Sequence, residues 1–153
     1  MFTFAREDPL GEDLALLHAR HTAAMHADTP PESIHMLPPD ALAAPEVAFF
    51  VMRREGAPIG MGALKRIDPT HAEVKSMHVL AEWRGQGLAR RLLDLMIREG
   101  RVAGFARLSL ETGSQGSFAA ARGLYANAGF VICPPFEGYG PDPNSVFMTR
   151  LIG

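Results

Sequence analysis

Residues 73–101 read EVKSMHVLAEWRGQGLARRLLDLMIREGR, and the rest of the chain can be arranged around them. Apolar and polar residues alternate over 73–80, which predicts a strand. Apolar residues recur at helical spacing over 90–97, which predicts an amphipathic helix. A short turn with Gly85 and Gly87 joins the two. The segment therefore predicts a strand, a glycine turn and a helix in direct succession.

This turn is a candidate site for a phosphate group. Glycine allows backbone conformations closed to other residues and lets a ligand approach the main chain. The amides that open the following helix lack intrahelical acceptors and lie at the positive end of the helix dipole. Arg84 can add a charge-assisted hydrogen bond. Together these features predict an anion-binding loop.

Two common phosphate-binding loops do not fit this turn. A P-loop requires Lys-Ser/Thr after its second glycine, where this chain has Leu88-Ala89. A dinucleotide-binding fingerprint requires glycine or alanine three places after Gly87, where Arg90 stands. The pattern that remains is (Gln/Arg)-x-x-Gly-x-(Gly/Ala), filled by Arg84, Gly87 and Ala89.

The composition is that of one globular domain over residues 1–153. A formal net charge of −2 and the absence of a basic stripe argue against a nucleic-acid binder. No apolar run is long enough to span a membrane, and residues 1–8 do not resemble a signal peptide. The single cysteine, Cys133, excludes an intrachain disulfide and fits a reducing compartment, so we expect a cytoplasmic protein.

The remaining elements follow from periodicity and turn residues. Short turns join the three strands at 46–54, 59–67 and 73–80, which predicts an antiparallel set. Asp40 is expected to cap a short helix, and Ser117 a longer one. The strand, helix, strand order after residue 73 implies a right-handed crossover and a parallel pair. Further strands are expected at 2–5, 106–111, 130–132 and 146–152, and helices at 12–27, 90–103 and 117–128.

Two motifs together carry a resemblance to a known family. The glycine turn resembles the acetyl-CoA pyrophosphate loop of the GNAT N-acetyltransferase superfamily. Leu124-Tyr125-Ala126-Asn127-Ala128-Gly129-Phe130 resembles that superfamily's Leu-Tyr-x-x-x-Gly-Phe. The order of elements also matches, so the resemblance covers the whole chain and implies a mixed α/β GNAT fold with about seven strands and three to four helices. Residues 110–113 and 143–148 are similar to a bacterial subgroup called YsnE-like.

The resemblance implies an acetyl-CoA-dependent N-acetyltransferase in which a primary amine attacks the thioester directly. It places the cofactor pyrophosphate on the loop Arg84-Gly85-Gln86-Gly87-Leu88-Ala89. It places the pantetheine arm along the main chain of Met77, His78 and Val79, where a bulge in this strand frees amides for the carbonyl oxygen. Many relatives carry asparagine seven residues before the motif tyrosine, where this chain has Phe118. We expect apolar packing of Phe118 with Ala121 to replace that contact.

Three side chains are candidates for proton transfer. By resemblance, Glu73 occupies the general-base position and Tyr125 that of the acid for the leaving thiolate. Glu111 ends the parallel strand, where ligand crevices open in such sheets, and is a second candidate for the base or an anchor for the substrate ammonium. His78 ranks lower, since alternation places its side chain opposite Glu73. A surface pair of Glu73 with Lys75 is the alternative without catalysis.

The acceptor is expected to be a small-molecule amine, because segments 29–39 and 133–144 are apolar or long enough to cover a pocket. Candidate substrate-binding residues are Met25, His35, Tyr139 and Asn144. The alternatives are an acyl-CoA sensor without turnover and a protein acetyltransferase, which would need an open groove. Homodimers are common in the superfamily and remain compatible with this chain. No metal is expected, because no carboxylate completes a ligand set with His18 and His21.

Overall fold

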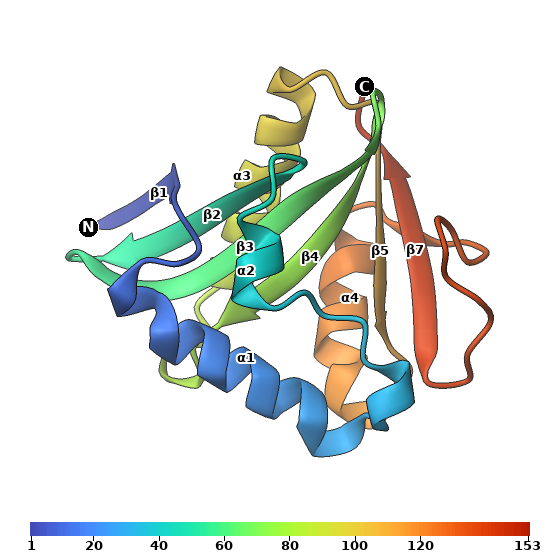
Figure 1. Cartoon of the computed structure of the whole chain (residues 1–153), viewed down its shortest axis with the longest axis horizontal. Helices are drawn as coiled ribbons and strands as arrows, with labels where there is room; N and C mark the ends of the chain where they lie inside the picture. Colours follow the sequence, from blue (N-terminus) through green and yellow to red (C-terminus); the bar gives the residue numbers. More distant parts are fainter.

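The computed structural model describes residues 1–153 and contains one sheet with the strand order β1-β2-β3-β4-β5-β7-β6 (Figure 1). All neighbouring strands are antiparallel except β4 and β5, which form the expected parallel pair. The strands are β1 Phe2–Arg6, β2 Val47–Arg54, β3 Ala57–Asp68, β4 His71–Val79, β5 Arg107–Gly113, β6 Val131–Ile132 and β7 Ser145–Leu151. The helices are α1 Ala15–Asp28, α2 Pro39–Leu42, α3 Leu88–Val102 and α4 Ala119–Asn127. The expected mixed α/β fold is confirmed.

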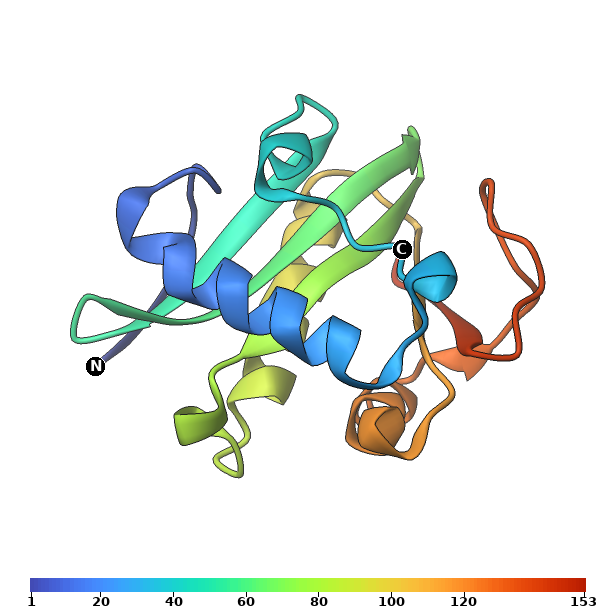
Figure 2. The ribbon, with the colours of Figure 1, turned by 60° about the horizontal axis from the view of Figure 1, so that its bottom comes forward.

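The helices cover the two faces of the sheet, as Figures 1 and 2 show: α1 and α2 lie on one face and α3 on the other. Leu14 and Leu17 pack with strand residues such as Met61 in the first core. In α3, Leu92 and Met96 are fully buried in the second core, whereas charged residues of the same helix face water. No helix combines the length and apolar composition that crossing a bilayer requires.

A tight turn joins β2 to β3 and starts the antiparallel set of β2, β3 and β4. Glu55 and Gly56 both have positive φ angles, 49° and 82°. Two such residues in succession form the type of tight turn whose twist matches that of paired strands. The turn fixes the register in which Arg54 lies opposite Ala57.

The strands β4 and β5 separate partway along their length, and this fork is the feature that matters for function. They pair only between residues 71–73 and 107–109. Beyond Glu73 the β5-facing edge of β4 has no strand beside it, and Figure 1 shows β4 and β5 diverging with α4 next to them. Backbone polar groups on this edge are therefore available to a ligand.

Two expected helix caps are wrong. Asp40 lies inside the first turn of α2, whose cap position is Pro38, and makes no capping hydrogen bond. Ser117 belongs to a 3-10 turn over 116–118 that precedes α4, and Phe118 holds the cap position. In both cases the chain enters the helix through a proline or a 3-10 turn, so no side-chain acceptor is used.

Candidate functional site

A bulge in β4 shapes the centre of the site. Ser76 has a φ of 57°, in the left-handed region, and the β3–β4 register shifts between Met61 and Ala63. Two residues of β4 therefore occupy the space of one, and the alternation of side chains reverses beyond Ser76. The prediction that His78 points away from Glu73 is wrong, because the bulge brings His78 onto the same face, where its ring contacts His21 of α1.

Gly62 lies opposite this bulge and makes room for it. A Cβ at Gly62 would fall 2.5 Å from the Met96 sulfur and 2.9 Å from the Met77 sulfur. The two thioethers therefore fill the space that any larger residue would need. This close approach places Met77 against the same core as Met96 of α3.

The glycine turn has the geometry of an anion site. Gly85 and Gly87 have φ angles of 79° and 75°, with nothing within 4 Å of where their Cβ atoms would lie. Among residues 85–91, only Arg91 has its N–H bonded to the backbone, at 3.1 Å to the Gly87 carbonyl. The amides of residues 85–90 therefore have no backbone acceptor. The Arg84 Nε donates to the Val79 carbonyl at 3.1 Å. A phosphate group fits this cradle of free amides.

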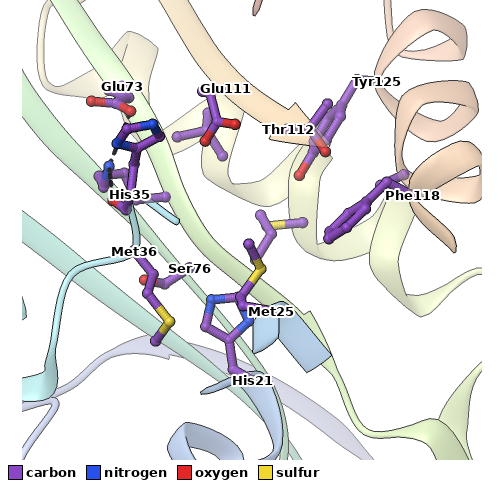
Figure 3. A pocket seen from close by; sticks show the side chains of 14 residues that line it. His21, Met25, His35, Met36, Glu73, Ser76, Glu111, Thr112, Phe118 and Tyr125 are labelled. Atoms are coloured by element: carbon purple, nitrogen blue, oxygen red, sulfur yellow. Dashed lines mark hydrogen bonds and ion pairs between the residues drawn. The ribbon is translucent and has the colours of Figure 1, made fainter. Parts of the chain in front are cut away.

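A cavity occupies the fork between β4 and β5. It brings together residues from α1, the 29–39 segment, both strands and α4, as Figure 3 shows. All three expected catalytic residues line it, as do Met25, His35, Met77, Phe118 and Ala121. The lining residues are His21, Met25, His35, Met36, Glu73, Val74, Lys75, Ser76, Met77, Glu111, Thr112, Phe118, Ala121 and Tyr125.

Glu73 lies at one end of the cavity in a closed polar cluster. Its Oε2 accepts hydrogen bonds from Lys75 Nζ at 3.1 Å and from the Tyr139 hydroxyl at 2.5 Å. Lys75 also donates to Tyr139 Oη at 2.9 Å and to the His35 carbonyl at 3.1 Å. Glu73 is only 3 % exposed, so the pair with Lys75 is buried. Sequence reasoning considered only a surface pair, although alternation already placed Lys75 on the face of Glu73.

Glu111 is the other carboxylate of the cavity and has no ion-pair partner. Burial raises its pKa to about 7, and the nearby charges of Glu73 and Asp142 add to this rise against the lowering influence of Ser145 and Lys75. In Figure 3 its carboxyl group points into the cavity between Glu73 and Tyr125. A carboxyl group with this pKa can take up and release a proton near neutral pH.

Tyr125 reaches the cavity from α4 and is 7 % exposed. Burial raises the pKa of its phenol, and the Glu111 charge raises it further, so the hydroxyl stays protonated at neutral pH. Gly129, with a φ of 94°, ends the helix and lets Phe130 turn back so that its ring packs edge-on against Tyr125. The motif thus holds one hydroxyl in the cavity.

The two covering segments meet above Glu73. Ser33 donates to Asp142 Oδ2 at 2.6 Å, and Asn144 Nδ2 donates to Ser33 at 3.3 Å. The rings of His35 and Tyr139 pack edge to face at 5.1 Å. Tyr139 therefore contacts Glu73 directly, whereas Asn144 holds the two segments together outside the cavity.

His21, which lines the cavity, and His78 behind it form a second buried feature. Each is 8 % exposed, and their ring centroids are 5.4 Å apart. Burial lowers the pKa of both groups to about 4, helped for His21 by His78 and for His78 by Arg84. Both rings are therefore neutral at physiological pH and act as uncharged polar groups.

Comparisons with known proteins agree on one family. A sequence profile of the Acetyltransferase (GNAT) family matches residues 14–130. The uncharacterised N-acetyltransferase YsnE of Bacillus subtilis is 44 % identical over 95 % of this chain and 97 % of its own length. A protein of Azospirillum brasilense named IAA acetyltransferase is 40 % identical over 97 % of this chain and 96 % of its own. A Klebsiella pneumoniae crystal structure described as an acyl-CoA N-acyltransferase superposes with a TM-score of 0.83 and 28 % identity, covering 100 % and 99 % of the two chains.

Proposed function

This chain belongs to the Acetyltransferase (GNAT) family, and from that premise we propose that it transfers the acetyl group of acetyl-CoA to the primary amine of a small molecule, by direct attack in a ternary complex. The observation that carries the proposal is that Glu111 and Tyr125 face one cavity at the fork between β4 and β5. A proton acceptor and a proton donor are the two groups that acyl transfer from a thioester to an ammonium requires.

The chain offers a suitable site for each end of the donor. The free amides of residues 85–90, with Arg84, bind the pyrophosphate. The β5-facing edge of β4 from residue 74 onward binds the pantetheine arm through backbone groups. Acetyl-CoA supplies the activated acetyl group, and the bulge at Ser76 leaves backbone amides free to stabilise the carbonyl oxygen.

Glu111 is the group that accepts the proton from the acceptor ammonium. An alkylammonium has a pKa near 10, so the amine must lose a proton before it can attack. A carboxylate with a pKa of about 7 is ionised in about half of the molecules at neutral pH and is a stronger base than an ordinary glutamate. Glu73, already bonded to Lys75 and Tyr139, holds these two side chains in place beside Glu111.

Tyr125 donates the proton that the departing thiolate requires. As the new C–N bond forms and the C–S bond breaks, the thiolate takes the phenolic proton, and the second proton that the nitrogen loses returns to the Tyr125 phenolate. Because burial keeps the phenol protonated, the donor is in its correct state at neutral pH. The thiol leaves as a neutral group, which cannot attack the new amide as effectively as a thiolate.

The covering segments support a small acceptor over a protein tail. The hydrogen bonds of Ser33 with Asp142 and Asn144, and the packing of His35 on Tyr139, join 29–39 to 133–144 above the cavity. A protein tail would need an open groove along this face. The name of the Azospirillum relative adds IAA to the compounds that deserve a test.

Thiol release from acetyl-CoA tests the proposal. The acceptors are monoamines, amino acids, polyamines, IAA and short peptides, run with the wild-type protein and with Glu111→Gln and Tyr125→Phe. Turnover with one class of small amine, lowered in both variants, supports the proposal. Efficient turnover with peptides alone would overturn the choice of a small acceptor. Acetyl-CoA binding without turnover on any compound would overturn the reaction.

A further inference from the structure

The cavity has a polar end and an apolar end, and the difference bears on which amines can enter. Glu73, Glu111 and His35 lie at the polar end, as Figure 3 shows. Met25, Met36 and His21 gather at the opposite end, next to Ser76. An amine whose ammonium group reaches Glu111 therefore projects its remaining atoms toward the apolar end.

The polar end has no spare cation. Lys75 is the only lysine or arginine that lines the cavity, and its ammonium group already donates to Glu73, Tyr139 and the His35 carbonyl. An ammonium group has three donors, so Lys75 is saturated. A carboxylate on the acceptor would have to leave water without a positive partner, which is costly. Acceptors that carry a carboxylate are disfavoured for this reason.

The same cluster disfavours a second positive charge. Glu73 is the carboxylate that could pair with a second ammonium, but the Lys75 ammonium holds it at 3.1 Å. A further cation would lie beside Lys75 and be repelled by it. Only Glu111 is left without a cation, and one such carboxylate serves one ammonium.

The apolar end suits a flat, uncharged tail. The thioethers of Met25 and Met36 line it, and methionine sulfur makes favourable contacts with aromatic rings. His21 is neutral there because burial lowers its pKa to about 4. The Ser76 hydroxyl is buried without a hydrogen-bond partner, although it lines the cavity. It can bond one polar atom of a tail, such as a hydroxyl or an indole N–H.

We propose that the acceptor is a primary amine with an aromatic tail that carries no second charge, selected by the internal neutralisation of Glu73 and Lys75 and by the thioether end of the cavity. The inference rests on the proposed function for the identity of the reacting group. The selection itself is a property of binding and can be measured separately from turnover.

Matched pairs of acceptors test the inference. Tryptamine is compared with tryptophan, phenethylamine with phenylalanine, and pentylamine with 1,5-diaminopentane, by thiol release and by the thermal shift of CoA-loaded protein. We expect kcat/KM to favour the singly charged member of each pair by about 100-fold, the effect of burying one unpaired charge. Equal or better use of the amino acids or the diamine would overturn the inference while leaving the proposed function in place.

The binding arm separates the two proposals. Stabilisation by tryptamine but not by tryptophan, without any thiol release, would support the inference and contradict the proposed function. Stabilisation by neither amine, or equally by both, would overturn the inference whatever the rate of thiol release.

Two substitutions should turn disfavoured acceptors into better substrates. Met36→Arg places a free cation at the apolar end and is expected to raise kcat/KM for 4-(2-aminoethyl)benzoate, whose carboxylate lies on the ring, at least about tenfold relative to phenethylamine. Lys75→Met frees Glu73 and is expected to favour 1,5-diaminopentane over pentylamine. Glu32→Arg, at an exposed position of the same covering segment, is the control and leaves both ratios unchanged. Lys75→Met removes a buried ion-pair partner of Glu73 and can unfold the chain. If this variant is unstable, Met36→Arg alone decides whether the inference holds. Unchanged ratios in Met36→Arg would overturn the inference.

Discussion

At the scale of single residues, the raised pKa of Glu111 sets the pH dependence of the reaction. Its carboxylate is needed as the base, and burial places its pKa at about 7. We expect kcat/KM to rise with pH through a midpoint near 7 in the wild-type protein. Glu111→Gln should lose that midpoint and reduce kcat/KM by roughly 100-fold, a usual contribution for a general base. Glu137→Gln, at an exposed position of the covering loop, is the control. If Glu111→Gln keeps a midpoint near 7, that midpoint belongs to another group.

Ionisation of the buried Glu111 carboxyl group should also lower the stability of the fold. A carboxyl group whose pKa is higher in the folded state stabilises the fold while it is protonated, and this contribution is lost as the pH rises from about 4.5 toward 7. Glu111→Gln removes the cost, on the order of 3 kcal/mol at most. We expect its Tm to exceed that of the wild-type protein by several degrees at pH 8 and to match it near pH 4. A gain of equal size at both pH values would show that packing, and not ionisation, causes it.

The two tyrosines should separate chemistry from acceptor binding. Tyr125→Phe removes the proton donor and is expected to lower kcat roughly 10- to 100-fold with little change in the KM of the acceptor. Tyr139→Phe removes a hydrogen bond to Glu73 and should act mainly on the KM of the acceptor. Steady-state kinetics with acetyl-CoA in excess measure both. The reverse pattern would exchange the roles given to the two residues.

At the scale of elements, the turn before α3 offers a controlled comparison of two glycines. Gly87 and Gly56 have φ angles of 75° and 82°, and neither has an atom within 4 Å of its Cβ position. Substitution by alanine should therefore cost similar stability at both, about 1 kcal/mol. Only Gly87→Ala should also weaken the binding of acetyl-CoA, because the methyl group blocks the cradle of free amides. Calorimetric titration with CoA measures the affinity. Equal affinities of the two variants would show that the turn is not the pyrophosphate site.

The elements themselves were largely predictable, and the exceptions have physical causes. Alternation, helical spacing and turn residues are local signals, so the strands, α3 and the parallel pair of β4 and β5 were expected. The resemblance implied a bulge in β4, but alternation alone does not place it at Ser76, because Gly62, which leaves room for the Met77 and Met96 sulfurs, lies on another strand. The bulge reverses the facing of His78. The predicted caps at Asp40 and Ser117 are wrong because the chain enters these helices through a proline or a 3-10 turn. The capping side chain that the sequence offers is then not used.

At the scale of the whole molecule, the site exists because separate parts of the chain converge on the fork. Glu111 and Tyr125 were both named from the sequence, but their facing one cavity depends on how α4 packs beside β5 (Figure 1). The contacts of Lys75 with His35 and Tyr139 span 40 and 64 residues of sequence. No local pattern encodes such contacts, so the closed polar cluster could be found only in the folded molecule.

The packing of α1 on the sheet should make the whole fold sensitive to acid. His21 and His78 are buried and neutral, with pKa values of about 4, whereas unfolded histidine titrates near 6.5. The unfolded chain therefore binds more protons between these values, and stability should fall as the pH drops from 6.5 to 4. Chemical denaturation across this range measures the slope. His21→Gln is expected to remove about half of the histidine contribution, since one of the two groups no longer titrates. His26→Gln, at an exposed position of the same helix, should leave the slope unchanged. If the two variants show the same slope, the acid sensitivity arises outside the histidine pair.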